Sequence, residues 1–164
     1  MKFKCYDVVE IQGKRYVVAE VISYQEFIID GTIHYDLNDE NYKKDLAVSK
    51  GIQPWTEYGL MPVNGKDKKW ITIVNGEKEY CTFSEPVLRS TPPKGYRLHD
   101  KGVERVISVE GQSKAREGDK ADYKEYRMIQ KDKNYVFFIE DWHGGLKDQA
   151  QGERIRLSDI RRCR

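Results

Sequence analysis

Cysteine is scarce in this chain, and its three cysteines are poorly placed for covalent or metal cross-links. Cys5, Cys81 and Cys163 are an odd number, and no two of them have the Cys-x-x-Cys spacing. A disulfide framework and a zinc knuckle are therefore not expected. A protein without such cross-links suits a reducing compartment, so the sequence predicts a cytoplasmic location.

Long apolar runs and an excess of one charge are also missing. No run of about 18 apolar residues occurs, and the N-terminal stretch turns polar too early for a signal peptide. The 29 Lys and Arg residues nearly balance the 27 Asp and Glu residues, which leaves a net charge of +2. We therefore expect no membrane span and no dedicated nucleic-acid-binding domain, because such domains are usually clearly basic. The length of 164 residues fits one domain, 1–164.

The common motifs for catalysis and cofactor binding are absent as well. The chain has neither of the glycine-rich phosphate loops, no Gly-x-Ser-x-Gly nucleophile and no His-Glu-x-x-His zinc motif. The sequence therefore predicts no cofactor and no metal site. It gives no direct sign of an enzyme, although side chains that are distant in sequence can still meet in the fold.

What the chain does contain is a series of short runs rich in Val, Ile, Tyr, Phe and Trp, which favour strands. Turn sequences separate these runs: Gln12-Gly13-Lys14, Asp30-Gly31, Asn64-Gly65 and Asn75-Gly76. Helical periodicity is limited to residues 38–51, which fit a polar loop equally well, and to one turn after Ser158. The sequence predicts an all-β fold, with one short helix as an option.

One stretch of the sequence occurs twice. Residues 55–76 and 123–144 align without a gap at a constant offset of 68 residues. The aligned pairs include Trp55 with Tyr123, Glu57 with Glu125, Tyr58 with Tyr126, Trp70 with Phe138 and Gly76 with Gly144. A fixed period indicates a repeated unit. Each copy has the pattern of a three-stranded meander that cannot bury its apolar face alone, so we expect the two to pack as a sandwich or a partly open barrel.

Two consecutive prolines mark the boundary between the copies. They lie in the segment 89–95, "RSTPPKG", and consecutive prolines cannot continue a strand ladder. We expect this segment to link a first half, 1–88, to a second half, 96–164.

The repeated pattern also carries a family resemblance. The first copy has Trp-x-Glu-Tyr-x-Leu, a turn with glycine, Trp-Ile and then Asn-Gly, and the second copy has "DYKEY" and "DWHGG". This pattern resembles bacterial domains of unknown function, the family numbered 4178, from about Tyr6 to Arg156. The resemblance implies a β-rich bacterial domain without an established activity, and it assigns no catalytic residue.

Glu57 and Glu125 are the candidate catalytic pair because they occupy equivalent positions in the two copies. If a pseudo-twofold arrangement brings the carboxyl groups together, their pKa values would separate and the pair could serve acid–base chemistry. A carboxylate-dependent hydrolase or lyase is one hypothesis on this basis. The alternative is that each glutamate pairs with a nearby lysine or arginine, or faces water.

Aromatic residues beside these glutamates suggest a binding surface instead. Trp55 and Tyr123 are expected on a strand face away from the core, where exposed aromatics often dominate binding energy. Trp142 and His143 in "DWHGG" are further candidates, although His143 also fits a plain turn before two glycines. Our leading hypothesis is therefore a non-enzymatic module that binds or scaffolds another protein.

A cluster of arginines near the C-terminus supports a different hypothesis. The cluster consists of Arg154, Arg156, Arg161, Arg162 and Arg164. Guanidinium groups suit phosphate, so a small barrel that binds nucleic acid is the main alternative function. Glu153 and Asp159 interrupt the cluster, and a solvated tail would have the same composition.

Overall fold

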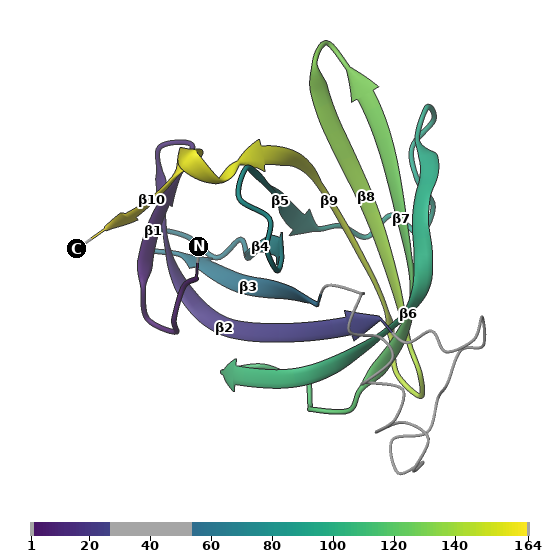
Figure 1. The fold of residues 1–164 in the computed structure, drawn as a ribbon, viewed down its shortest axis with the longest axis horizontal. Helices are drawn as coiled ribbons and strands as arrows, with labels where there is room; N and C mark the ends of the chain where they lie inside the picture. The colour runs from purple at the N-terminus through teal and green to yellow at the C-terminus, as the bar shows by residue number, and fades with distance from the viewer. Residues whose placement is uncertain (1, 27–53, 164) are drawn as a thin grey trace.

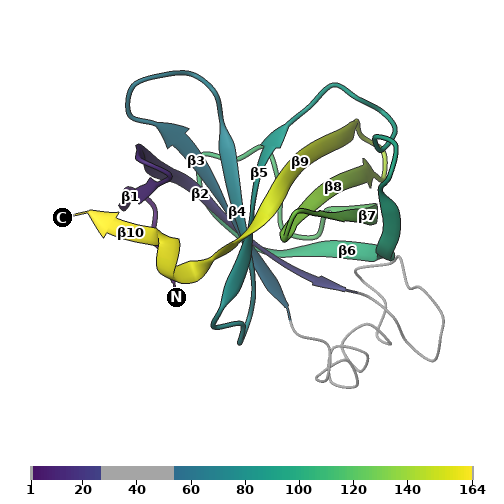
Figure 2. The same ribbon diagram turned by 90° about the horizontal axis from the view of Figure 1, so that it is seen from above.

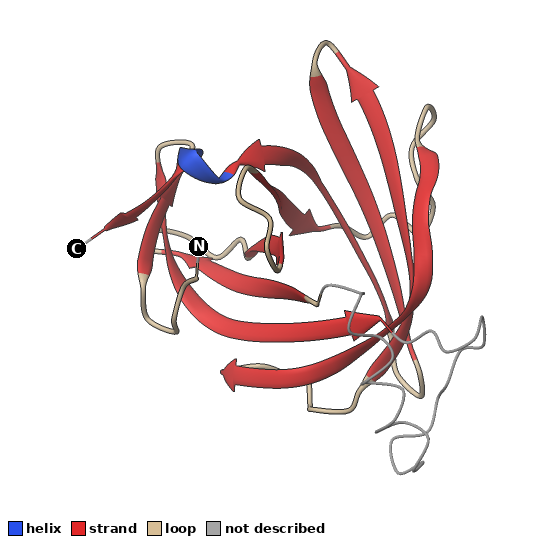
Figure 3. Ribbon diagram, viewed as in Figure 1, coloured by secondary structure: helices blue, strands red, loops and turns tan. Residues whose placement is uncertain are grey.

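The computed structural model describes residues 2–26 and 54–163, and this part of the chain is almost entirely β-strand (Figure 3). The strands are β1 (Val8–Ile11), β2 (Lys14–Glu26), β3 (Trp55–Pro62), β4 (Lys69–Val74), β5 (Tyr80–Pro86), β6 (Arg97–Gly111), β7 (Lys120–Gln130), β8 (Lys133–Trp142), β9 (Lys147–Arg156) and β10 (Ile160–Cys163). The predicted all-β class is confirmed. The expected hairpin at Asp30-Gly31 and the optional helix at 38–51 lie outside the described residues.

Eight of these strands close a ring. The hydrogen-bonded order is β2-β3-β4-β5-β9-β8-β7-β6, and β6 pairs again with β2. All of these pairings are antiparallel, and Figure 1 shows β2 and β6 side by side where the ring closes. The fold is therefore a closed antiparallel β-barrel, and not the sandwich or partly open barrel expected from the sequence. Closure removes the unpaired strand edges that an open sheet exposes.

The long strand β2 makes this arrangement possible by pairing with two strands along one edge. Its first residues pair with β1, whereas Glu20–Glu26 pair with β6. A β-bulge lies between Val18 and Glu20, and bulges bend and twist a strand. Tyr16, before the bulge, belongs to a small apolar core, whereas Tyr24, after it, belongs to a second cluster inside the barrel.

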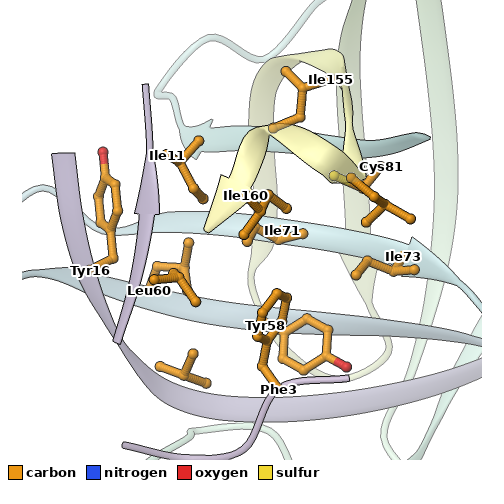
Figure 4. Packing of buried hydrophobic residues seen from close by; sticks show 13 residues of the cluster. Phe3, Ile11, Tyr16, Tyr58, Leu60, Ile71, Ile73, Cys81, Ile155 and Ile160 are labelled. Atoms are coloured by element: carbon orange, nitrogen blue, oxygen red, sulfur yellow. The ribbon is translucent and has the colours of Figure 1, made fainter. Parts of the chain in front are cut away.

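The small core lies between β1, the first part of β2, β3, β4, β5 and β10 (Figure 4). Ile11, Leu60 and Ile71 are at most 1% exposed, and the ring of Phe3 meets that of Tyr58 edge-on at 5.2 Å. Each fully buried side chain of this kind contributes about 1.5–3 kcal/mol. This core therefore fixes one face of β3 and β4, whose other face forms the wall of the barrel.

Two three-stranded meanders, β3-β4-β5 and β7-β8-β9, meet where β5 pairs with β9. Figure 2 shows β4 and β5 between β1 and β10 on one side and β6 to β8 on the other. The gap-free alignment does not hold in the register: Tyr58 pairs with Ile71, but Tyr126 pairs with Phe137 and not with Ile139. The reason is a shorter turn between β7 and β8, and the shift of two residues preserves the faces. The repeat itself remains a prediction.

The C-terminal segment differs from its prediction. A single 3-10 turn, η2 (Leu157–Asp159), is followed by β10, which pairs with β1 from Val8 to Ile11. The helical turn expected after Ser158 is therefore wrong, because pairing with β1 outweighs the local preference of this segment. The proline segment 89–95 lies between β5 and β6, as expected for a connection. Within the described ranges, no helix has the length and apolarity needed to cross a membrane.

Candidate functional site

The strand β3 separates the small core from the barrel interior. Side chains alternate along a strand, so Tyr58 points into the small core while Trp55 and Glu57 point into the barrel. Trp55 stacks on Tyr24 of β2 with ring centroids 5.9 Å apart, and it meets Tyr123 of β7 edge-on at 5.8 Å. Because β3 and β7 are not neighbours in the ring, the second contact crosses the barrel interior.

All three tryptophans of the protein line this interior. Trp55, Trp70 and Trp142 pack against a buried cluster that includes Tyr24 and Val106. The rings of Tyr24 and Trp142 lie 6.4 Å apart. Tryptophan emission should therefore report directly on what occupies the barrel.

Four glutamates point into the same interior from four different strands. Glu20 and Glu104 are 2% and 1% exposed, and Glu57 and Glu140 are half-buried. Together with the aromatic rings they form the acidic-aromatic site, defined as Glu20, Glu57, Glu104, Glu140, Tyr24, Trp55, Trp70 and Trp142. Burying a carboxylate is costly unless a partner compensates its charge, so the partners of each group decide what the site can do.

Glu20 has a cationic partner from its own chain. Lys68 Nζ lies 2.6 Å from Glu20 Oε1 and 4.0 Å from the centroid of the Trp70 ring. The ammonium group thus sits between a buried carboxylate and the face of an indole ring, which attracts cations through its quadrupole. Gly59 allows this packing, because a Cβ there would lie only 2.5 Å from Cγ of Glu20.

Among the described residues, Glu57 has no ion pair of its own and a single weak hydrogen bond. Its Oε1 accepts a hydrogen bond of 3.4 Å from the hydroxyl of Tyr24. Burial raises the pKa of Glu57 well above its usual range, and the carboxylates of Glu140 and Glu20 raise it further. Lys68 and the Tyr24 hydroxyl oppose this rise. The ionised form of Glu57 is therefore disfavoured in the folded protein.

Glu104 and Glu140 form a pair of interacting carboxyl groups. Glu140 lies opposite Tyr123, and Glu104 lies opposite Ala121, so both project from the inner face. Burial raises the pKa of Glu104 to about 8, whereas burial and the neighbouring Glu104 raise the pKa of Glu140 well above its usual range. The proximity of the two acids opposes the ionisation of Glu140 in particular. Such a pair can move a proton or receive a cation.

The exposure of the side chains differs within the site. Glu57, Glu140 and the three tryptophans are half-buried, whereas Glu20 and Glu104 are buried. Oε1 of Glu104 and Oε2 of Glu140 are shielded from solvent. The carboxyl groups therefore lie in surroundings far less polar than bulk water.

Tyr123 does not provide the exposed aromatic anchor expected from the sequence. It shares the inner face with Trp55, but it is only 5% exposed. Its hydroxyl donates a hydrogen bond of 3.2 Å to Asp100 Oδ2, and burial, together with Glu26 and Asp100, raises its pKa. The expectation of an exposed pair is wrong because the face away from the small core points into the barrel, where Tyr123 packs against Trp55. Whether Trp55 and Tyr123 bind anything remains a prediction.

Glu125 is engaged elsewhere and is not the main carboxyl neighbour of Glu57. Its Oε2 lies 3.3 Å from Arg127 Nη2 and 3.8 Å from His99 Nε2. The carboxylates that act most strongly on Glu57 are those of Glu140 and Glu20. The expected Glu57–Glu125 pair is therefore replaced by other partners, because β3 and β7 bring their aromatic ends together and not their glutamates.

The remaining candidates from "DWHGG" lie at one end of the site. Trp142 donates a hydrogen bond of 3.0 Å from Nε1 to Asp148 Oδ2. His143 lies in the turn after β8, and its Nε2 is 3.1 Å from Asp122 Oδ1. Among residues 2–26 and 54–163, no three His, Cys, Asp or Glu side chains are grouped so that they could hold a metal ion. Burial raises the pKa of the Cys81 thiol to about 12, which makes it a poor nucleophile.

The C-terminal arginines do not form one basic surface. Arg154 is half-buried and donates to Thr82 Oγ1 at 3.1 Å. On β10, Arg161 binds Glu10 Oε2 at 2.7 Å, and Arg162 contacts Asp7 and the backbone oxygen of Lys2. Arg156 is exposed on β9, and Arg164 lies outside the described residues. Arg161 and Arg162 thus already have acidic partners, and the nucleic-acid surface expected from the sequence remains a prediction.

Two grooves of about 500 Å³ each lie on the outside of the barrel. The first is lined in part by Lys69, Glu85 and Tyr135, and Lys69 is ion-paired with Glu85. The second includes Lys14 and Arg15. Both grooves mix charges of both signs at the surface, and neither combines buried titratable groups with tryptophan as the acidic-aromatic site does.

Comparison with known families places the whole barrel in one family. The family model described as Domain of unknown function (DUF4178) matches residues 5–157. The chain belongs to this family. The match confirms the resemblance expected from the sequence, and it includes β1 to β9 with every residue of the acidic-aromatic site. No curated protein and no solved structure matches the chain.

Sequence reasoning found only part of the site in this DUF4178 domain. It named Trp55, Glu57 and Trp142 but missed the other members and the lysine: Glu20, Glu104, Glu140, Tyr24, Trp70 and Lys68. One signal was present, because Glu20 falls in phase with the buried alternating residues of β2, from Tyr16 to Tyr24. A glutamate in the buried phase of a strand indicates a polar interior and not a uniform apolar core.

Proposed function

We propose that this DUF4178 domain is a non-enzymatic binding module that holds an organic cation in its barrel. The observation that carries the proposal is the position of Lys68. Its ammonium group lies against the Glu20 carboxylate and the Trp70 ring, so the wall of the barrel already binds an alkylammonium group of its own chain. Carboxylates combined with tryptophan faces are the usual chemistry for binding cations in proteins.

The charge balance of the site supports the same function. Lys68 compensates Glu20, but the charged groups that act most strongly on Glu104 and Glu140 are other carboxyls. These groups remain neutral by keeping protons, which is the usual response of buried acids without a counter-charge. An incoming cation would replace those protons, so the site is suited to a positively charged ligand.

The nature of the partner follows from this chemistry. The sequence predicts that another protein is recognised, and a lysine side chain on a partner presents the same alkylammonium group as a free amine. The experiment distinguishes a free amine from a lysine of a partner protein, because the barrel interior should admit a free amine more readily than a side chain on a folded surface.

The test is a titration with n-butylammonium, which copies the side chain of lysine, followed by tryptophan fluorescence. We expect a saturable change in emission that n-butanol, the uncharged analogue, does not produce at equal concentration. A lysine-containing peptide is the second arm and should bind only if the source is a protein. The absence of a saturable response to both cations, or an equal response to n-butanol, would refute the proposal.

Two other functions receive less support. The Glu104–Glu140 pair favours acid–base chemistry, as in a hydrolase or lyase, because it shares a proton near neutral pH. This pair takes the place of the expected Glu57 and Glu125, and loss of turnover without loss of binding in a Glu140→Gln variant would support catalysis. Nucleic-acid binding receives less support from the arginines, because Arg161 forms an ion pair with Glu10 and Arg162 forms one with Asp7.

A further inference from the structure

The four carboxyl groups of the acidic-aromatic site come from four strands and influence one another. Lys68 contacts Glu20. Glu20 and Glu140 act on Glu57, and Glu57 acts on Glu104, which is coupled to Glu140. The hydroxyl of Tyr24, which contacts Glu57, lies within the influence of all four acids. The site is therefore one group of coupled acids, in which Glu20 has Lys68 as its cationic partner.

A separate observation indicates that the Glu104–Glu140 pair lacks its natural partner. Glu104 is 1% exposed, and its Oε1 has no hydrogen-bond donor among the described residues. Oε2 of Glu140 is likewise buried without a donor. Buried carboxyl oxygens are nearly always hydrogen-bonded, so these two atoms are exceptions. A ligand that brings N–H donors would satisfy both atoms.

We infer that the ligand is a linear polyamine, with its successive ammonium groups on Glu57 and on the Glu104–Glu140 pair and its methylene segments along the aromatic rings. The inference rests on the proposed function and narrows its ligand class. Glu20 is already matched by Lys68, which leaves three carboxyls, and a linear triamine carries three positive charges. A single ammonium group would leave two of the three without a counter-charge.

The aromatic rings beside the acids also favour an alkyl amine. The rings of Tyr24 and Trp55 stack at 5.9 Å, Tyr123 meets Trp55 edge-on at 5.8 Å, and the ammonium group of Lys68 lies over the ring of Trp70. The methylene segments of an amine bury apolar surface when they pack on such rings. This contact selects alkyl amines over small inorganic cations.

Binding should release protons, because a polyamine competes with the protons held by these carboxyls. Glu104 faces Glu26 of β2, Glu57 of β3 and Glu140 of β8, and all of these groups raise its affinity for a proton or share one with it. Affinity for an amine should therefore increase from pH 6 to pH 9, up to about tenfold per pH unit for each proton released. Above that range the amine loses its own charge and affinity should fall again.

The experiment is isothermal titration calorimetry with spermidine and with n-butylammonium at pH 7.5 and constant ionic strength, in two buffers that differ in ionisation enthalpy. We expect spermidine to bind at least about tenfold more tightly than the monoamine, since each further charge-assisted contact adds that much or more. We also expect the buffer difference to reveal proton release. Both the Glu57→Gln and the Glu140→Gln variants should lose about tenfold in affinity for spermidine.

The matched control is Glu117→Gln, which removes the same charge from an exposed position between β6 and β7. It should leave spermidine affinity unchanged. Glutamine has the shape of a protonated glutamate, so both interior variants should fold, and a melting curve verifies this before titration. Equal affinities for spermidine and n-butylammonium would overturn the inference but leave the proposed function standing. Failure of both amines would overturn both, and equal losses in the control and the interior variants would show binding at the surface only.

Discussion

The Glu104→Gln variant should be more stable than the wild type at neutral pH. Burial raises the pKa of Glu104 from 4.5 to about 8 in the folded protein, whereas the unfolded chain keeps the ordinary value. Between these values, folding requires the carboxyl to take up a proton. Stability linked to this group is therefore complete below about pH 4.5 and is lost as the pH rises towards 8.

The magnitude follows from the same two values. One pKa unit corresponds to 1.36 kcal/mol, so the loss for the wild type is about 3 kcal/mol at pH 7 and about 4 kcal/mol at pH 8. Glutamine stays neutral at every pH, and its Oε1 can still accept the proton of Glu140. The variant should thus equal the wild type near pH 4.5 and exceed it by about 3 kcal/mol at pH 7.

Urea unfolding followed by tryptophan emission, at a series of pH values from 4.5 to 8, measures this difference. The exposed Glu117→Gln variant serves as the control for a change of net charge and should follow the wild type. If the wild type and the Glu104→Gln variant lose stability in parallel as the pH rises, Glu104 is ionised in the folded protein. The conclusion that buried carboxyls in the barrel keep their protons at neutral pH would then be wrong.

Two further predictions concern folding. Glu57→Gln should leave the melting temperature at pH 7 unchanged or raised, because burial disfavours the ionised form of this carboxyl and glutamine is neutral. Glu125→Gln should lower the stability of the protein by up to about 1 kcal/mol, because it removes the ion pair with Arg127. Separate melting curves of the two variants test this, and a clear fall in the melting temperature of the Glu57 variant alone would contradict it. Gly152→Ala should destabilise the folded protein by about 3 kcal/mol, because a Cβ would lie 2.0 Å from the backbone oxygen of Phe83. A variant with the melting temperature of the wild type would show that β5 and β9 are farther apart.

The local parts of the fold could be predicted from the sequence, whereas its closure could not. Alternating apolar residues and the Asn64-Gly65 turn are local signals, and they correctly indicated β3 and β4. Closure depends on pairs such as Glu20 with Gly111, which are distant in sequence. Pairing of this kind leaves no signature in either strand alone. The same reason explains β10, whose strand conformation depends on β1 and not on its own residues.

The site was found in part because repetition drew attention to Glu57, and its partner was missed for a physical reason. Equivalent positions in two meanders suggest that Glu57 and Glu125 should meet, but the meanders join through β5 and β9, at the opposite edge from β3 and β7. The carboxylates that act most strongly on Glu57 are those of Glu140 on β8 and Glu20 on β2. Alternation in the sequence places Glu57 on the face of Trp55 and Glu125 on the face of Tyr123, a face that we expected to lie away from the core, but contact between the glutamates depends on how the ring closes.

The acidic interior is difficult to explain by folding alone. Replacing buried charged groups with apolar side chains of similar volume is often neutral or stabilising, and the raised pKa of Glu104 predicts a loss of about 3 kcal/mol at pH 7. Glu20 reduces its own cost by pairing with Lys68, which shows that this chain can compensate a buried acid when it supplies a cation. For Glu104 and Glu140, the strongest charged neighbours are other acids. A ligand that brings the missing positive charge would stabilise the ionised carboxyls, and it would stabilise the folded protein as well, because it binds only the folded state. The same residues would then explain three predicted properties: a lower stability at neutral pH without ligand, the release of protons on binding, and selectivity for an amine.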